Sequence, residues 1–158
     1  GMAMICRPDV LIADEPTTAL DVTIEAQILN LMKQLQEEGT SILMITHNLG
    51  VVAEICDFVY VMYAGQVIEY ADVYDLFEEA GHPYTEGLMA AMPSTENSER
   101  LYNIPGAVPP LNSLPRGCRF HPRCEKKIDR CSRERPLLYD IGNGHQVRCF
   151  LYDKEDGQ

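Results

Sequence analysis

The chain has 158 residues, of which 46% are hydrophobic, and its 24 acidic residues outnumber 13 basic ones to give a formal net charge of −11. An acidic balance of this size disfavours nucleic acid as the main partner, because phosphate backbones attract Lys and Arg. The sequence has no apolar run of about 18 residues that would predict a transmembrane helix, and no signal-peptide pattern. These features predict a cytoplasmic globular protein of one domain, or of a small domain with an appendage.

The first expected element is a strand that stops on two adjacent carboxylates. Val10 to Ala13 form a continuous apolar run, which is typical of a buried parallel strand, and Asp14 and Glu15 follow it. Acids at the carboxyl end of such a strand lie where open α/β sheets bind ligands. The first can hold Mg²⁺ and the second can orient or deprotonate a water. The alternative is a pair of solvated acids that merely end a strand.

A βαβ unit is expected next. Asp21 is a plausible N-cap, apolar residues at helical spacing predict a helix over 22–38, and a second apolar strand over 41–46 leads to His47. The helix between the two strands predicts a βαβ unit in which the strands pair in parallel. Further along, the patterns predict a short helix over 49–55, a hairpin of strands 58–63 and 66–70, a helix over 73–80, and another helix that begins with Pro83 in its first turn.

The residues after the two acids make a specific motif. The run from Val10 to Asp21, with Pro-Thr-Thr-Ala-Leu-Asp at its end, resembles the Walker B motif and D-loop of ABC-type ATPases. His47, at the end of the next strand, resembles the switch histidine of the same family. A lone histidine after a strand is more often structural, but here it follows a Walker B-like strand, a helix and a loop in the family's order.

The resemblance implies ATP and Mg²⁺ as cofactors and a role for each motif residue. Asp14 would hold Mg²⁺, directly or through water, and Glu15 would be the general base for the attacking water. Asp21 would contact a second ATPase subunit, and His47 would sense the γ-phosphate. In this class catalysis is mostly positioning and charge stabilisation, so losing Glu15 or His47 is expected to stall hydrolysis more than binding.

Two later segments narrow the resemblance to one branch. His82-Pro83-Tyr84 at a helix start and Ile104 to Pro110 in a proline-rich stretch resemble the oligopeptide and dipeptide importer ATPases. This implies membrane permease subunits, a second ATPase subunit and, indirectly, a peptide-binding protein as partners, with the chain peripheral on the inner face of the membrane. A nickel-importer ATPase stays an alternative. A non-transport ABC ATPase of translation or DNA repair is disfavoured by the acidic body and the His82 segment.

Parts of the family pattern are absent from these 158 residues. No G-x-x-x-x-G-K-[ST] phosphate loop and no serine-glycine-glycine signature occurs. We therefore expect a partial P-loop NTPase (ABC ATPase) domain that lacks the Walker A half, over residues 1–92, and an irregular Cys-rich C-terminal extension over 93–158. The Walker A strand would lie between the strands at 41–46 and 58–63, so unpaired edges, self-association and no ATP hydrolysis by the chain alone are expected.

Four of the six cysteines gather in the last third of the chain, at Cys118, Cys124, Cys131 and Cys149. In a cytoplasmic protein such a group suggests a metal rather than disulfides. The spacing fits structural zinc poorly, because zinc ligands usually come in close pairs. Four thiolates suit an iron–sulfur cluster, and the importer resemblance implies a 4Fe–4S cluster. Metal-free reduced thiols are the rival reading, and His121 is a possible substitute ligand.

The same segment is strongly basic. Residues 116–135 hold eight of the thirteen Lys and Arg residues. An anionic cluster would give these cations a role as counter-charges. An iron–sulfur or zinc module with a vestigial ATPase half is therefore the second hypothesis for the function.

Overall fold

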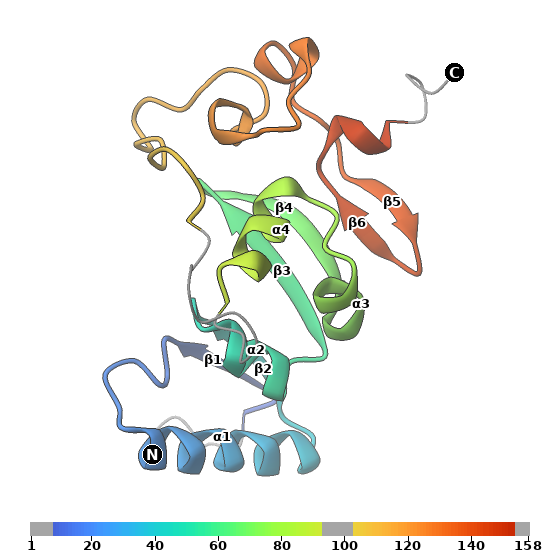
Figure 1. The fold of residues 1–158 in the computed structure, drawn as a ribbon. Helices are drawn as coiled ribbons and strands as arrows, with labels where there is room; N and C mark the ends of the chain where they lie inside the picture. The colour runs from blue at the N-terminus through green and yellow to red at the C-terminus, as the bar shows by residue number, and fades with distance from the viewer. Residues whose placement is uncertain (1–7, 93–102, 154–158) are drawn as a thin grey trace. The chain divides into compact units, whose positions relative to one another are not determined.

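The computed structural model describes residues 8–92 and 103–153, and its architecture is mixed α/β (Figure 1). Contacts divide the chain into two compact units, unit 1 (Gly1–Cys56) and unit 2 (Asp57–Gln158). The units therefore divide after Cys56 and not at the expected boundary between residues 92 and 93. The physical reason is that strands near the C-terminus pair with a strand from the 57–92 region, which makes these segments one body.

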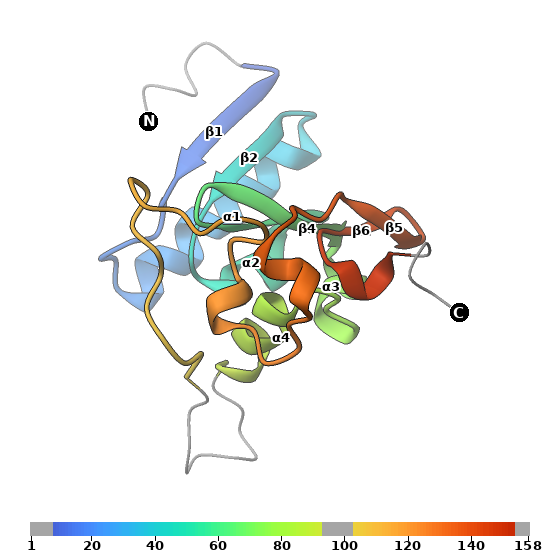
Figure 2. The ribbon, with the colours of Figure 1, turned by 90° about the horizontal axis from the view of Figure 1, so that it is seen from above.

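Unit 1 is the expected βαβ unit. Strand β1 (Val10–Asp14) leads to helix α1 (Val22–Glu37), strand β2 (Ser41–Ile45) and helix α2 (Leu49–Ile55), and β1 pairs with β2 in parallel. The Asp21 carboxylate accepts the Ile24 N–H at 3.0 Å, which caps α1 and is worth about 1 kcal/mol. Helix α1 covers one face of the two strands (Figure 2). The core beneath it is built around Ala13, Leu29, Met32 and Val51.

The other face of this sheet carries exposed apolar side chains. Val10 and Ile12 of β1 and Leu43 and Ile45 of β2 are each 49–65% exposed. Successive side chains of a strand alternate between faces, so these four share the face opposite to α1. Among the described residues β2 pairs only with β1, which leaves its other edge unpaired. This agrees with the expected unpaired edge beside the strand at 41–46.

Unit 2 is built on a four-stranded antiparallel sheet. Its elements are, in chain order, β3 (Phe58–Tyr63), β4 (Gln66–Asp72), α3 (Val73–Glu78), α4 (Pro83–Ala90), η2 (His121–Arg123), η3 (Asp129–Ser132), β5 (Tyr139–Gly142), β6 (His145–Val147) and η4 (Phe150–Tyr152). The strand order is β3-β4-β6-β5. Its core joins residues of the β3–β4 hairpin to Leu76 and Phe120.

The C-terminal extension is more regular than expected. We expected an irregular segment over 93–158, but β5 and β6 form a hairpin whose inner strand pairs with β4. Both strands are short, so their alternation is hard to see in the sequence. The proline-rich part behaves as expected where it is described: residues 103–117 contain no helix or strand. Residues 93–102 lie outside the described part.

No helix in the described ranges 8–92 and 103–153 is long and apolar enough to cross a membrane.

Candidate functional site

The first candidate site lies at the carboxyl ends of β1 and β2 in unit 1. The parallel register pairs Asp14 with Ile45, so the residues that follow the two strands emerge at the same edge. The Glu15 N–H continues the ladder by donating to the Ile45 carbonyl at 2.8 Å. Glu15 and His47, which are 32 positions apart, therefore meet because of strand pairing.

Glu15 has an unusual backbone conformation. Its φ of +47° lies in the left-handed region, which non-glycine residues rarely adopt. The chain turns there, and the Thr18 N–H donates back to the Glu15 carbonyl at 3.2 Å. Such conformations persist where the surroundings hold them, and they are concentrated at functional sites. After this turn, the Glu15 carboxylate lies in contact with the His47 ring.

Both oxygens of the Glu15 carboxylate have partners. Its Oε1 lies 2.8 Å from His47 Nδ1, and its Oε2 accepts the Thr18 hydroxyl at 2.7 Å. The bond from His47 and then that from Thr18 hold the pKa of Glu15 below its usual value. Because the carboxylate accepts from Nδ1–H, the neutral His47 ring carries a lone pair on Nε2. The pair can thus orient a water and take up a proton.

The two aspartates predicted as site residues lie in different settings. Asp14 ends β1 with an exposed side chain, on the same strand end as Glu15. Asp21 is also exposed, and its carboxylate caps α1. No group of three or more His, Cys, Asp or Glu within residues 8–92 and 103–153 could hold a metal ion. The Mg²⁺ role of Asp14 therefore stays a prediction.

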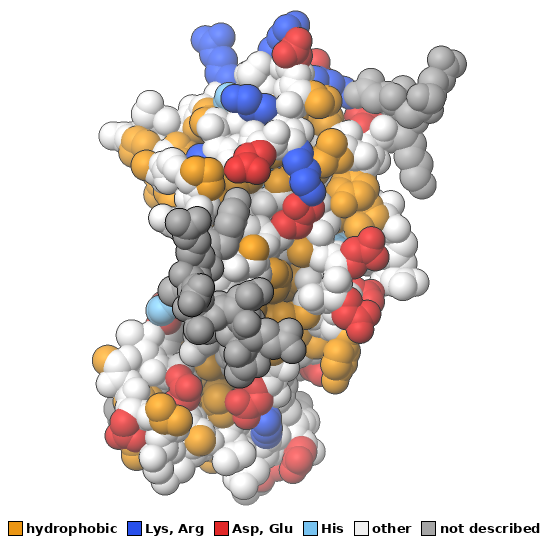
Figure 3. All heavy atoms as spheres, viewed as in Figure 1, with side chains coloured by type: hydrophobic (Ala, Val, Ile, Leu, Met, Phe, Trp, Pro, Cys, Tyr) orange, Lys and Arg blue, Asp and Glu red, His pale blue; other side chains and the backbone are white. Residues whose placement is uncertain are grey.

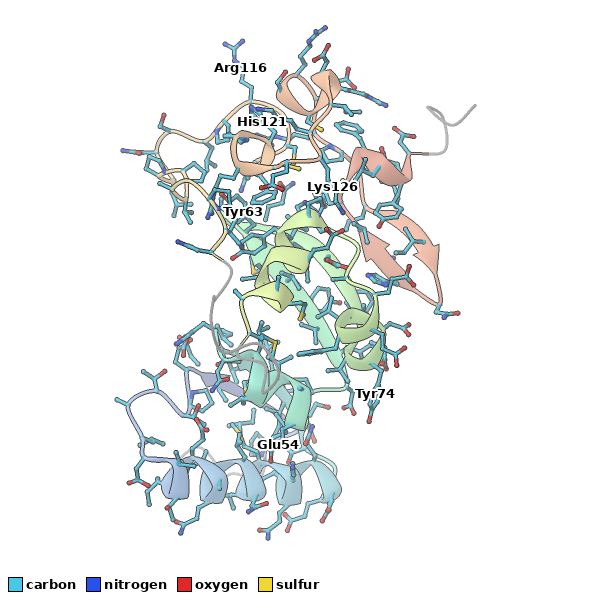
Figure 4. The ribbon with its side chains drawn as sticks, in the orientation of Figure 1. Glu54, Tyr63, Tyr74, Arg116, His121 and Lys126 are labelled. Carbon is cyan, nitrogen blue, oxygen red and sulfur yellow. The ribbon has the colours of Figure 1, made fainter. Side chains whose placement is uncertain are left out.

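The second candidate site is a small cavity in unit 2. Its wall includes all four predicted ligands, Cys118, Cys124, Cys131 and Cys149. Cys124 follows η2, Cys131 lies in η3, and Cys149 precedes η4. His121 and Lys126, which also line the cavity, are labelled in Figure 4. All four thiols are free in the structure. The four cysteines thus line one cavity, but no group of three or more His, Cys, Asp or Glu in the described part of the chain is arranged to hold a metal ion, and their role as ligands stays a prediction.

A close backbone contact brings two of these cysteines together. The Cys118 N–H donates to the Cys131 carbonyl at 2.9 Å. Gly117 precedes it with a φ of +72°, and a Cβ there would lie 2.4 Å from the Cys131 carbonyl oxygen. Only glycine fits this approach. Four cysteines are the usual number of ligands of an iron–sulfur cluster, and four line this cavity.

The cavity wall also determines the state of the thiols. Burial raises the pKa of Cys118 and Cys124, and it raises the pKa of Cys149 to about 11. These thiols are therefore protonated at neutral pH, and a bound cation would be needed to hold them as thiolates.

Three basic residues of this segment form contacts away from the cysteines. Arg119 donates to the Ala64 carbonyl, Arg123 to the carbonyls of 104 and 105, and Lys126 to Glu86. Their first role in the structure is to pin the segment to the β3–β4 hairpin and α4. The surface view shows Lys and Arg side chains gathered over this end of unit 2 (Figure 3). The expected counter-charge role is not tested by these contacts.

Sequence reasoning missed a buried polar group in unit 2. Glu69, on β4, is fully buried, and its carboxylate accepts from the Gly81 N–H, from the His82 N–H at 3.0 Å and from His145 Nε2 at 2.7 Å. A Cβ at Gly81 would lie 2.5 Å from a Val147 methyl, so the loop approaches closely. The signal in the sequence was a charged residue, Glu69, that stands between apolar residues of β4.

The sequence pointed to His82 only as part of a segment typical of the importer branch. In the structure its side chain also caps a helix and lines the cysteine cavity. It is 1% exposed, caps α4 by accepting the Tyr84 N–H on Nδ1 at 3.0 Å, and lines the cysteine cavity. Burial lowers the pKa of His82 to about 3, so the ring is neutral at physiological pH.

Comparison with known proteins gives consistent matches. Residues 68–131 match the family model described as the oligopeptide/dipeptide transporter, C-terminal region. The oligopeptide transport ATP-binding protein AppD of Bacillus subtilis is 55% identical over 160 residues, which cover 100% of this chain and 49% of AppD. The oligopeptide transport ATP-binding protein OppD of Haemophilus influenzae is 51% identical and covers 96% of this chain and 47% of OppD.

A third relative extends the match to dipeptide systems. The dipeptide transport ATP-binding protein DppD of Escherichia coli is 48% identical, over 94% of this chain and 46% of DppD. The chain spans about half the length of the curated relatives it matches. Over its whole length the chain corresponds to the C-terminal half of the ATP-binding subunits of the oligopeptide/dipeptide ABC transporter family.

Proposed function

We propose that this chain is the C-terminal half of an ATP-hydrolysing subunit of a peptide importer, and that it supplies the hydrolytic carboxylate and its histidine partner. The observation that carries the proposal is the contact between Glu15 Oε1 and His47 Nδ1 at 2.8 Å, at the carboxyl ends of two parallel strands. Ligands bind at this edge in open α/β sheets.

Each residue of the site has a definite task in this proposal. Glu15 accepts the proton of the attacking water, and the bonds from His47 and Thr18 keep its carboxylate ionised and aimed. His47 holds the pair in register and places its ring at the γ-phosphate. Asp14 binds Mg²⁺, which neutralises phosphate charge when bound. Asp21 lies at the contact with a second ATPase subunit.

The partners follow from the same proposal. The subunit works with a permease pair at the inner face of the membrane and with a second ATPase subunit, and a peptide-binding protein delivers the cargo. The chain alone carries no phosphate-binding loop among its 158 residues. It therefore needs a Walker A-bearing half to bind and hydrolyse ATP.

A transport assay with a chimera tests this proposal. The chimera joins the N-terminal half of AppD, the 55% identical relative, to this chain, and it replaces AppD in Bacillus subtilis. We expect the chimera to restore growth on an oligopeptide that the strain requires, and Glu15→Gln to abolish it. The matched control is Glu37→Gln, an exposed helix residue outside the site. Failure of a stably expressed chimera, or growth with Glu15→Gln, contradicts the proposal.

We propose an iron–sulfur centre in unit 2 as a second function, because four cysteines that are far apart in the sequence line one cavity. A 4Fe–4S cluster would be held by the thiolates of Cys118, Cys124, Cys131 and Cys149, and it supplies redox chemistry or stabilises the fold when bound. The spacing of these cysteines fits a structural zinc site less well, because zinc ligands usually come in close pairs. Anaerobic reconstitution with iron and sulfide, followed by metal analysis and absorbance, tests it. We expect iron and visible absorbance in the wild type and neither when the four cysteines are replaced by serine. A colourless, iron-free wild type would contradict the cluster.

A further inference from the structure

The ring of His47 is not held in place by packing. Its side chain is 80% exposed, and its contact with Glu15 Oε1 at 2.8 Å is made at the surface of unit 1. An exposed imidazole on a free loop samples several rotamers, and fixing it costs conformational entropy. The place of the ring therefore depends on how firmly the backbone is held on each side of His47.

Strand pairing fixes the backbone on the N-terminal side of His47. Ile45 of β2 is paired with Asp14 of β1, and the Ile45 carbonyl accepts the Glu15 N–H at 2.8 Å. The strand end that precedes His47 is thus fixed relative to Glu15. Strand pairing does not hold the residues beyond this point, because β2 ends at Ile45.

Asn48 holds the backbone on the C-terminal side, where α2 begins at Leu49. It is the N-cap of this helix, and its Oδ1 accepts the Gly50 N–H at 3.0 Å and the Val51 N–H at 3.4 Å. The first N–H groups of a helix have no acceptor within the helix, so a side-chain oxygen at this position stabilises the first turn. The Asn48 carbonyl also accepts the Val52 N–H, at 3.1 Å.

Asn48 also ties the loop to itself and to the core. Its own N–H donates to Thr46 Oγ1 at 3.1 Å, which closes a turn with His47 at its centre. Val51, one of the residues whose N–H it caps, is 3% exposed and belongs to the core of unit 1. An exposed histidine is thus joined, through the residue that follows it, to the buried core of its unit.

We propose that Asn48 is a positioning residue of the hydrolytic pair: its side chain fixes the backbone that follows His47 and thereby keeps the ring in contact with Glu15. This inference rests on the role proposed above for Glu15 and His47. Asn48 takes no part in the reaction and acts through the ring beside it. Its amide caps the helix without adding a second carboxylate next to the ring that Glu15 holds.

Nuclear magnetic resonance of this chain tests the proposal without nucleotide. A neutral ring that donates to the Glu15 carboxylate carries its proton on Nδ1, and long-range ¹H–¹⁵N spectra report how much of this tautomer is present. We expect the Nδ1–H form to predominate in the wild type and to be less populated in Asn48→Ala, because the loop loses its cap. Asn48→Ser, which supplies another neutral capping oxygen, is expected to retain it. The matched control is Asp72→Ala, which removes the cap of α3 in unit 2 and is expected to leave the His47 tautomer unchanged. 

Amide hydrogen exchange in the wild type tests the cap itself. The Gly50 and Val51 N–H groups are expected to exchange slowly, because Asn48 supplies the acceptor that the first turn of α2 lacks. This measurement needs no variant, so the proposal stays testable if Asn48→Ala does not fold. Three results would each overturn the inference: unprotected Gly50 and Val51 amides, an unchanged His47 tautomer in folded Asn48→Ala, and an Asn48→Ser variant that behaves like Asn48→Ala.

ATP turnover of the chimera with the N-terminal half of AppD gives a second readout. Asn48→Ala is expected to lower kcat about fivefold, the change in population that one helix cap supplies, with ATP binding unchanged. Asn48→Ser is expected to restore most of the turnover. A kcat that stays at the wild-type value, or a loss of ATP binding that accounts for the lower turnover, would overturn the proposal. A wild-type chimera without turnover contradicts the hydrolytic role alone, because the His47 tautomer still decides whether Asn48 positions the ring.

Discussion

The buried carboxylate of Glu69 is predicted to be a main determinant of the stability of unit 2. It joins β4 to the loop before α4 through the N–H groups of Gly81 and His82, and to β6 through His145. Replacing it by the isosteric glutamine removes the charge and puts an NH₂ group opposite one of these N–H donors. Little solvent reaches this group, because Glu69 is fully buried and His145 is 5% exposed.

The expected cost follows from the number of donors left without an acceptor. An unsatisfied buried polar group costs about 1–3 kcal/mol. Breaking a buried ionic or polar pair on one side costs roughly 3–5 kcal/mol. Since Gln retains one acceptor oxygen, we expect Glu69→Gln to lose about 3 kcal/mol of unfolding free energy. With a denaturant slope of about 2 kcal/mol/M, the urea midpoint falls by about 1.5 M.

Urea unfolding followed by far-ultraviolet circular dichroism measures this change. The matched control is Glu78→Gln, an exposed residue on α3, which is expected to change the midpoint little. A loss below about 1 kcal/mol, the usual scale of a surface change, would refute the reasoning that the three donors depend on Glu69.

Three further predictions concern pH, the Glu15 pair and the open sheet face. Burial lowers the folded-state pKa of His82 to about 3, so between that pH and the unfolded pKa of about 6.5 the unfolded chain binds a proton that the folded chain does not. The free energy of unfolding therefore falls as the pH drops through this window, by up to about 1.4 kcal/mol per pH unit. Denaturation curves of His82→Asn should show a weaker dependence on pH. His47→Ala is expected to raise the pKa of Glu15 toward its usual value, by more than Thr18→Ala does, as read from carboxyl ¹³C shifts against pH; no change in His47→Ala would show that the contact is absent in solution. We also expect the chain to self-associate at high concentration, and Ile12→Lys, which puts a charge on the apolar face of β1, to reduce the mass measured by light scattering; a monomeric wild type would contradict this.

The local pattern of the chain predicted most of the elements. The bounds of β1, α1, β2 and α2 follow the apolar runs and the caps within a residue or so. Each of these elements is a continuous segment, and the spacing of its own apolar residues predicts it without reference to distant parts of the chain. The Glu15–His47 contact also followed, because parallel pairing through a short crossover brings the ends of β1 and β2 together.

Long-range pairing in unit 2 could not be predicted in the same way. β6 has three residues and β5 has four, too few to show alternation, and β6 pairs with the distant strand β4, for example Tyr70 with Gln146. The buried Glu69–His145 pair depends on that pairing, so no local signal reveals it. The four cysteines were predicted as metal ligands from their residue type, whereas the place of His82 on the cavity wall depends on the packing of the start of α4 against Phe120.

The ATP turnover of the purified AppD chimera tests the central claim most directly. We predict steady hydrolysis by the chimera, none by this chain alone, and loss of turnover with retained ATP binding in both Glu15→Gln and His47→Ala. Turnover that persists in Glu15→Gln would contradict the claim that Glu15 and His47 form the hydrolytic pair.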